Sequence, residues 1–126
     1  MPRDGTDSSL VARAAARAAS EKQGERTVIL DVRNLIVITD YFVVTSGSSE
    51  RQVRTIAEEI QKSLAESGAR AVRREGESEG KWVLIDYVDI VVHVFGEEER
   101  DFYDLERLWR DAPRLDWEPS GAASSV

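Results

Sequence analysis

The sequence contains no cysteine and a single histidine, His93. The absence of cysteine excludes disulfides and thiolate metal sites. No apolar run approaches the roughly 20 residues that a membrane-spanning helix needs, and the first residues lack the basic and then apolar pattern of a signal peptide. We therefore expect a cytoplasmic protein with no membrane segment, no metal and no cofactor.

Length and composition fit one ordinary globular domain. The chain has 126 residues, of which 41% are hydrophobic and 33% are charged, as is usual for a domain with one core. The formal net charge is −7, which argues against nucleic acid as the main partner because phosphate binding relies on clustered Lys and Arg. The segment 70–76 is locally basic, and we interpret it as a solvated strand. An acidic protein suits a basic protein partner instead.

Hydrophobic periodicity predicts both helices and strands. The expected helices are 8–24, 48–68 and 96–112, and the expected strands are 27–33, 41–45, 69–76, 81–87 and 89–95. This order predicts an α/β (α+β) single domain, with a mixed sheet of about five strands flanked by helices. The domain is expected over residues 9–112, between a flexible N-terminus at 1–8 and a disordered tail at 113–126.

The three predicted helices differ in the apolar stripe that each offers to the sheet. The second helix has the clearest stripe, and Ser49 with Gln52 predicts a capping box at its start. The first helix is mostly alanine, so we expect it to bury little and to lie at the edge of the fold. The stripes are Leu10, Val11, Ala14, Ala15 and Ala18 in the first helix, Val53, Ile56, Ala57, Ile60 and Leu64 in the second, and Phe102, Leu105, Leu108 and Trp109 in the last.

An enzymatic site is one interpretation of Gly47-Ser48-Ser49, where small residues open a helix after a strand. A helix N-terminus can hold phosphate, and nucleotidyltransferases combine such a turn with carboxylates at alternate strand positions that hold two metal ions. Asp86 and Asp89 are three residues apart, so they lie on opposite faces of one strand or on different strands, and neither placement forms such a clamp. We interpret the turn as a helix start and predict no catalytic site.

His93 lies in an apolar strand, where alternation places Ile90, Val92 and Val94 on the opposite face. Metal binding would need further ligands, and the chain has no second histidine and no cysteine. We interpret His93 as a structural residue, hydrogen-bonded to a carboxylate such as Asp89 or to the backbone.

Four large aromatic residues, Trp82, Tyr87, Tyr103 and Trp109, gather in the last third of the chain. Trp109 falls on the stripe of the last helix and is expected in the core, whereas Tyr103 lies one residue off that stripe, at its border. Trp82 begins a strand. Amphipathic aromatics at such margins are either interface anchors or plugs at a sheet edge, and the pattern alone leaves both open.

Several motifs together resemble the ribosomal silencing factor (RsfS) family, also called Iojap-like. They are ITDYFVVTSGSSERQV at 38–53, Glu75-Gly76, WVLIDYVDIVVHVF at 82–95 and RDFYDLERLW at 100–109. The resemblance covers roughly residues Leu10 to Trp109, which is nearly the whole expected domain.

The resemblance implies a nucleotidyltransferase-like fold without the catalytic carboxylates. It implies a non-enzymatic homodimer that binds the large ribosomal subunit through ribosomal protein L-fourteen. The bound factor would block joining of the small and large subunits and so repress translation during starvation or stationary phase. The family's contact surface corresponds here to Trp82, Tyr87, Tyr103 and Leu105, with Asp86, Asp89 and His93 nearby.

One departure from the family concerns the corner between the last two strands. The family usually has glycine before the aspartate of this corner, and this chain has Val88. We expect a less tight turn, or a Val88 side chain that packs. Three alternatives to silencing stay open: a divergent nucleotidyltransferase, a plain dimerisation module, and a large-subunit assembly factor, which is the role of organellar relatives.

Overall fold

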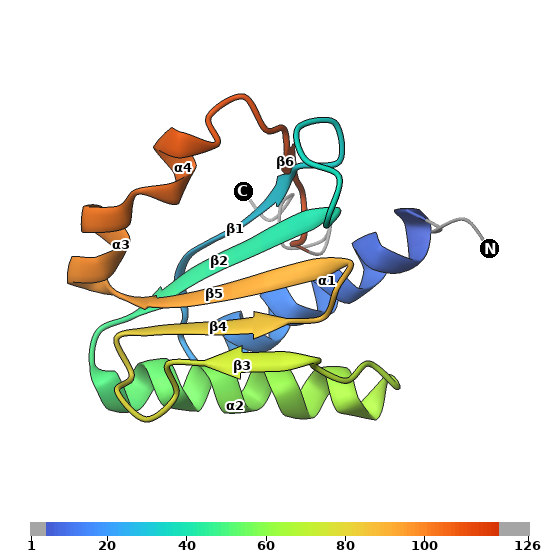
Figure 1. The fold of residues 1–126 in the computed structure, drawn as a ribbon. Helices are drawn as coiled ribbons and strands as arrows, with labels where there is room; N and C mark the ends of the chain where they lie inside the picture. The colour runs from blue at the N-terminus through green and yellow to red at the C-terminus, as the bar shows by residue number, and fades with distance from the viewer. Residues whose placement is uncertain (1–4, 119–126) are drawn as a thin grey trace, which may run out of the picture.

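In residues 5–118, which the computed structural model describes, six strands form one sheet and four helices pack against it (Figure 1). The strands are β1 (Glu25–Asp31), β2 (Tyr41–Gly47), β3 (Arg73–Glu75), β4 (Trp82–Asp86), β5 (Ile90–Gly96) and β6 (Arg114–Leu115). The helices are α1 (Gly5–Glu21), α2 (Glu50–Glu66), α3 (Glu97–Tyr103) and α4 (Leu105–Leu108).

The sheet is mixed, as the sequence predicts. Its strand order is β3-β4-β5-β2-β1-β6. β2 and β5 pair in parallel, and the other neighbours pair antiparallel. The chain between β2 and β5 runs through α2 and returns along β3 and β4, so β5 enters the sheet between two strands that precede it in the sequence.

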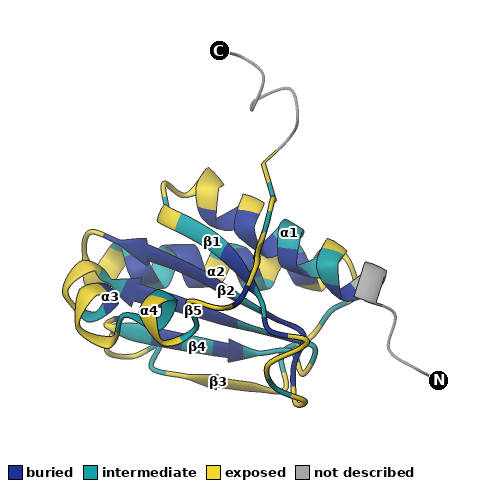
Figure 2. Ribbon diagram, turned by 90° about the horizontal axis from the view of Figure 1, so that it is seen from above, coloured by how far each residue is buried: buried dark blue, intermediate teal, exposed yellow. Residues whose placement is uncertain are grey.

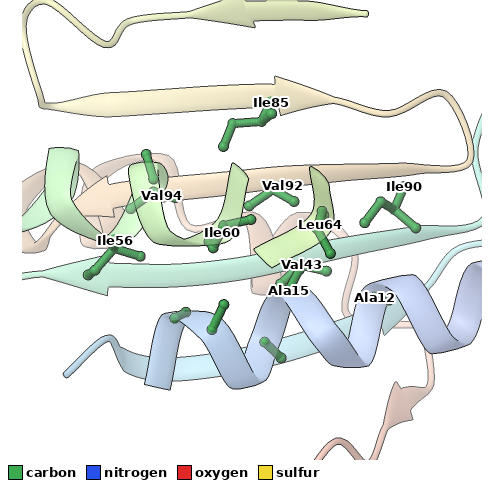
Figure 3. Packing of buried hydrophobic residues seen from close by; sticks show 14 of the residues in the cluster. Ala12, Ala15, Val43, Ile56, Ile60, Leu64, Ile85, Ile90, Val92 and Val94 are labelled. Atoms are coloured by element: carbon green, nitrogen blue, oxygen red, sulfur yellow. The ribbon is translucent and has the colours of Figure 1, made fainter. Parts of the chain in front are cut away.

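The first face of the sheet is covered by α1 and α2, whose apolar side chains pack against the strands in the larger of two core clusters. The predicted stripe of α2 is confirmed, because all five of its residues are buried. Figure 3 shows Ile56, Ile60 and Leu64 of α2 directed toward the sheet. Burying an Ile or Leu side chain contributes roughly 1.5–3 kcal/mol to folding, so this face is a major source of stability.

α2 begins with the predicted cap in a modified form. The hydroxyl of Ser49 accepts a hydrogen bond from the backbone N–H of Gln52 at 3.0 Å. The side-chain oxygen of Gln52 accepts one from the backbone N–H of Ser48 at 2.6 Å. The reciprocal half of the capping box is therefore displaced by one residue.

α1 belongs to the core, and the prediction that it buries little at the edge of the fold is wrong. An alanine side chain ends at Cβ, so the α1 backbone can lie close to α2 and to the sheet and fill space that larger side chains would otherwise occupy. The larger Leu10 is exposed. The buried alanines are Ala12, Ala15, Ala16, Ala18 and Ala19.

Both predicted flexible ends are partly ordered. α1 already begins at Gly5. After residue 112, β6 pairs with β1, and the Nε1–H of Trp117 donates a hydrogen bond to the carbonyl oxygen of Thr27 at 3.0 Å. The prediction of disorder is therefore wrong for the segment 114–117, which main-chain pairing and the indole hold in place. Residues 1–4 and 119–126 lie outside the described residues.

The predicted last helix is divided into α3 and α4 at Asp104. This residue has left-handed dihedral angles, with φ 48° and ψ 57°. The break changes the phase of the helix, so the stripe expected to be buried does not share one face. Leu105 and Trp109 pack against the second core cluster, whereas Phe102 is 80% and Leu108 70% exposed. The second core cluster is the smaller one, and its buried residues are Leu30, Val32, Val44, Phe95 and Ala112. Figure 2 shows how much of α3 and α4 is exposed.

The corner between β4 and β5 is tight and does not match either expectation for Val88. Val88 has a φ of 74° and an exposed side chain. A carboxylate oxygen of Asp86 accepts a hydrogen bond from the Val88 N–H at 2.8 Å, and the Asp89 N–H donates to the Tyr87 carbonyl at 2.9 Å. The chain thus keeps a turn that suits glycine and places a β-branched residue in it, which is unfavourable.

We predict that Val88→Gly raises the free energy of unfolding by about 1 kcal/mol, because relief of the left-handed strain exceeds the added entropy of the unfolded chain. Urea unfolding measures the change. The control is Val72→Gly, at an exposed valine whose φ is not positive, and this variant should lose stability. Equal losses in both variants would contradict strain at Val88.

Candidate partner-binding surface

The second face of the sheet carries a connected cluster of rings. Strand alternation places His93 and Phe95 of β5 on this face and Ile90, Val92 and Val94 in the core of the first face, as predicted. Each ring lies 4.4–6.2 Å from its neighbours, centroid to centroid. The aromatic cluster consists of Phe42, Trp82, His93, Phe95, Tyr103 and Trp109.

Trp82 of β4 and Tyr103 of α3 meet at the exposed end of the aromatic cluster. Their ring centroids are 4.4 Å apart with an interplanar angle of 44°. Tyr103 is 45% exposed, and Phe102 stands edge-on beside it at 5.0 Å. Trp82 and Tyr103, which are 21 residues apart in sequence, therefore lie side by side because α3 packs beside the strands.

The turn between β3 and β4 determines where Trp82 begins its strand. Gly76 has a φ of 88°, and a Cβ at this position would collide with the carbonyl oxygen of Trp82. The Gly76 carbonyl accepts a hydrogen bond from the Gly80 N–H at 3.0 Å. Only glycine fits this close approach, which gives a structural reason for Gly76 in the Glu75-Gly76 motif.

His93 is structural, as predicted, but its partner is different. The indole Nε1–H of Trp82 donates a hydrogen bond to His93 Nδ1 at 3.2 Å, so the expectation of a carboxylate or backbone partner is wrong. Burial lowers the pKa of His93 to about 4, and the imidazole is neutral at pH 7 with its proton on Nε2. Among the described residues, Nε2 has no hydrogen-bond partner. His93 therefore orients Trp82 as an acceptor.

The remaining predicted site residues do not all join the aromatic cluster. Leu105 packs against the second core cluster. Asp86 ends β4, at the opposite end of this strand from Trp82, and Asp89 lies in the corner that leads to β5. Tyr87 packs against the first core cluster, where burial raises its pKa. Trp82, Tyr103 and the buried His93 lie together in the aromatic cluster, and Tyr87 does not belong to it.

The Gly47-Ser48-Ser49 turn lies at the carboxyl ends of the parallel strands β2 and β5. A cavity of about 340 Å³ opens there, lined partly by Lys81 and by Glu97, Glu98 and Glu99. The carboxylates of these three glutamates disfavour a phosphate at this end, and the Ser48 N–H is already bonded to Gln52. Within residues 5–118 no group of three or more His, Asp or Glu residues is arranged to hold a metal ion.

Sequence reasoning missed some members of this surface. It did not assign Phe42 to the aromatic cluster, since the pairing of β2 with β5 that brings Phe42 beside Val91 is a long-range feature. It placed Phe102 and Leu108 in the core, whereas both line an open depression of about 600 Å³ together with charged residues of α3 and α4.

The described helices include none that is long and apolar enough to cross a membrane.

Comparison with known proteins gives a consistent result. The family model described as "Ribosomal silencing factor during starvation" matches residues 6–125. The ribosomal silencing factor RsfS of Halalkalibacterium halodurans is 43% identical over 104 residues, which cover 82% of this chain and 89% of that protein. A crystal structure of a Chromobacterium violaceum protein superposes with a TM-score of 0.78 at 37% identity, covering 80% of this chain and 84% of that one. A mouse protein named "Mitochondrial assembly of ribosomal large subunit protein 1" is 34% identical over 74 residues, covering 56% of this chain and 32% of that protein.

We predict that acidification destabilises the protein partly through His93. Its folded pKa of about 4 lies below the ordinary value of 6.5, so the unfolded chain binds the proton first and stability falls as pH drops from about 6.5 to about 4. The full effect is about 3 kcal/mol. Urea unfolding at pH 7 and pH 4.5 measures it. His93→Asn, which keeps an acceptor for Trp82 but does not titrate, should lose less stability than the native chain over this interval; equal losses would contradict the shift.

Proposed function

The chain belongs to the ribosomal silencing factor family, and we propose that it binds the large ribosomal subunit through ribosomal protein L-fourteen. The bound protein would sterically block the joining of small and large subunits and so repress translation during starvation or stationary phase. The observation that carries the proposal is the pair of contacting rings on the second face of the sheet, the exposed Tyr103 and the partly buried Trp82.

Several physical features of this surface support a protein partner. Trp and Tyr combine a large apolar area with a polar group and dominate binding energy at interfaces. The Trp82 ring contacts Phe95 and is hydrogen-bonded to His93. Because its position is already fixed, it loses little conformational entropy when a partner binds. The exposed Phe102 extends the apolar area beside Tyr103. The net charge of −7 suits a basic ribosomal protein.

We further propose that the protein is not an enzyme. Asp86 ends β4 and Asp89 lies in the corner before β5, and glutamates line the cavity beside the turn that a nucleotidyltransferase would use for phosphate. Both features argue against the alternative of a divergent nucleotidyltransferase. Magnesium-dependent nucleotide binding, measured by calorimetry, would contradict this part of the proposal.

A cytoplasmic location and a homodimer in the free state complete the proposal. The location follows from a ribosomal partner, and the dimer rests on the family resemblance. Sedimentation of the free protein as a monomer at micromolar concentration would contradict the dimer. Neither nucleic acid nor a membrane is needed as the main partner.

A role in large-subunit assembly is the second candidate. The name of the mitochondrial relative favours it, although this chain spans only a third of that protein. The two functions differ in what happens without the protein. Silencing predicts complete large subunits that join small subunits more readily, whereas assembly predicts an accumulation of incomplete large subunits in sedimentation profiles.

We predict that Trp82→Ala and Tyr103→Ala each weaken binding to isolated large subunits by about 2 kcal/mol, or about thirtyfold in Kd, because each removes a hot-spot ring. Co-sedimentation measures the affinity, and thermal melting establishes that each variant is folded. Small subunits added afterwards should join large subunits in the presence of either variant.

The matched control for these variants is Trp117→Ala. Trp117 packs against the first core cluster, so its removal should lower the melting temperature and leave the affinity of the folded protein unchanged. If Trp82→Ala and Tyr103→Ala bind normally while folded, the interface lies elsewhere on the molecule.

We predict that the association rate with large subunits falls as salt concentration rises. Salt at 0.1 M screens the attraction between exposed charges that are more than about 10 Å apart. The acidic chain should therefore associate with a basic partner faster at low salt. Dissociation should change less, because the ring contacts are short-ranged. Stopped-flow mixing at several salt concentrations measures both rates, and an association rate independent of salt would rule out steering.

A further inference from the structure

The largest fully buried side chain of the described residues is a charged one, Arg100 of α3, which is 1% exposed. A buried guanidinium is unfavourable unless hydrogen bonds and an opposite charge compensate for the lost water. Arg100 belongs to a motif that this chain shares with the family. Its burial is explained neither by the ring contacts of the proposed surface nor by apolar packing in the core.

The donors of Arg100 connect three parts of the fold. Nη1 donates to the hydroxyl of Ser46 in β2 at 3.1 Å, and Nη2 donates to the carbonyl oxygen of Arg26 in β1 at 2.6 Å. Nε donates to a carboxylate oxygen of Glu106 in α4 at 2.9 Å. Arg26 lies where the β1–β2 register shifts and has a φ of 51°, so a local irregularity of β1 provides one of the acceptors.

Glu106 provides the opposite charge. Its partial burial raises the pKa, but the hydrogen bond and charge of Arg100, together with Arg114 and Arg26, lower it by more, so the net pKa is below the ordinary value. Glu106 is therefore ionised at neutral pH, and its negative charge compensates for the positive charge of the buried Arg100. The second contact of Glu106, to the exposed Arg114, is longer at 3.6 Å.

This ion pair joins the two sides of the bend between α3 and α4, and Tyr103 lies at that bend. Arg100 precedes the left-handed Asp104, and Glu106 follows it. Apart from Arg100, no residue of α3 or α4 within the described chain is buried. Leu105 packs against the sheet only in part, and the ion pair of Asp101 with Arg26 is exposed. The hydrogen bonds of Arg100 are therefore the buried polar connection between this segment and the sheet.

We propose that Arg100 and Glu106 are positioning residues of the partner-binding surface: their buried ion pair fixes the α3–α4 bend to β1 and β2 and thereby holds Tyr103 against Trp82. This rests on the proposed function, since it assigns a role at the same surface. The pair does not touch the partner. It acts through Tyr103, whose ring would otherwise lose its fixed place.

The test uses Glu106→Gln, which keeps the size and an acceptor oxygen but removes the charge. We expect affinity for isolated large subunits to fall by about tenfold, as when a charged hydrogen bond is lost. In a Tyr103→Ala background the same change should cost less than about twofold, because the effects of coupled residues are not additive. A merely structural role would produce the same fall in both backgrounds. The control is Arg114→Gln, which removes the exposed partner of Glu106 and should bind as the native chain does.

A second measurement does not depend on binding. NMR cross-relaxation between the rings of Trp82 and Tyr103 should be present in the free native protein and lost in Glu106→Gln, while amide exchange in β2 and β5 is unchanged. If the ring contact survives in Glu106→Gln, or if its affinity equals that of the native chain, the positioning role is overturned. If the native chain does not bind large subunits but the ring contact depends on Glu106, the proposed function fails and the positioning role stands.

Discussion

Strand β5 is the constraint on which both faces of the molecule depend. It is hydrogen-bonded to β4 on one side and to β2 on the other, so its side chains have only two directions available. Ile90, Val92 and Val94 enter the core beneath α1 and α2, and His93 and Phe95 enter the aromatic cluster. A slip of one residue in its register would exchange these two sets and place the imidazole of His93 among the apolar side chains beneath α1 and α2.

The two faces are stabilised by different means. The first face is a close-packed apolar core, in which alanines let α1 approach and branched side chains of α2 fill the remaining space. The second face has fewer buried apolar residues and relies on ring contacts and on the buried hydrogen bonds of Arg100. This division leaves apolar rings exposed on an ordered scaffold, which is the arrangement that a binding surface needs because rigid anchors lose little entropy when a partner docks.

His93 and Arg100 illustrate two ways of keeping a polar side chain inside this scaffold. His93 is buried without its charge, and its ring orients the Trp82 indole through one hydrogen bond. Arg100 cannot lose its charge, so it needs Glu106 and several neutral acceptors. His93 contacts the ring of Trp82, and Arg100 lies in the same short helix as Tyr103, so the geometry of the surface depends on buried groups.

The sequence by itself determined what local chemistry dictates. The apolar period of α2 and its cap at Ser49, the alternation of β5, and the unsuitable spacing of Asp86 and Asp89 all depend on residues that are close in the chain. Tertiary structure decided the rest. Alanines are buried in α1 because another helix and the sheet lie close by, and Phe102 is exposed because Asp104 takes a left-handed conformation that no local pattern requires. The indole partner of His93 and the acceptors of Arg100 come from other strands and helices. Periodicity shows which face of an element is apolar, but only the packed fold determines what lies against that face.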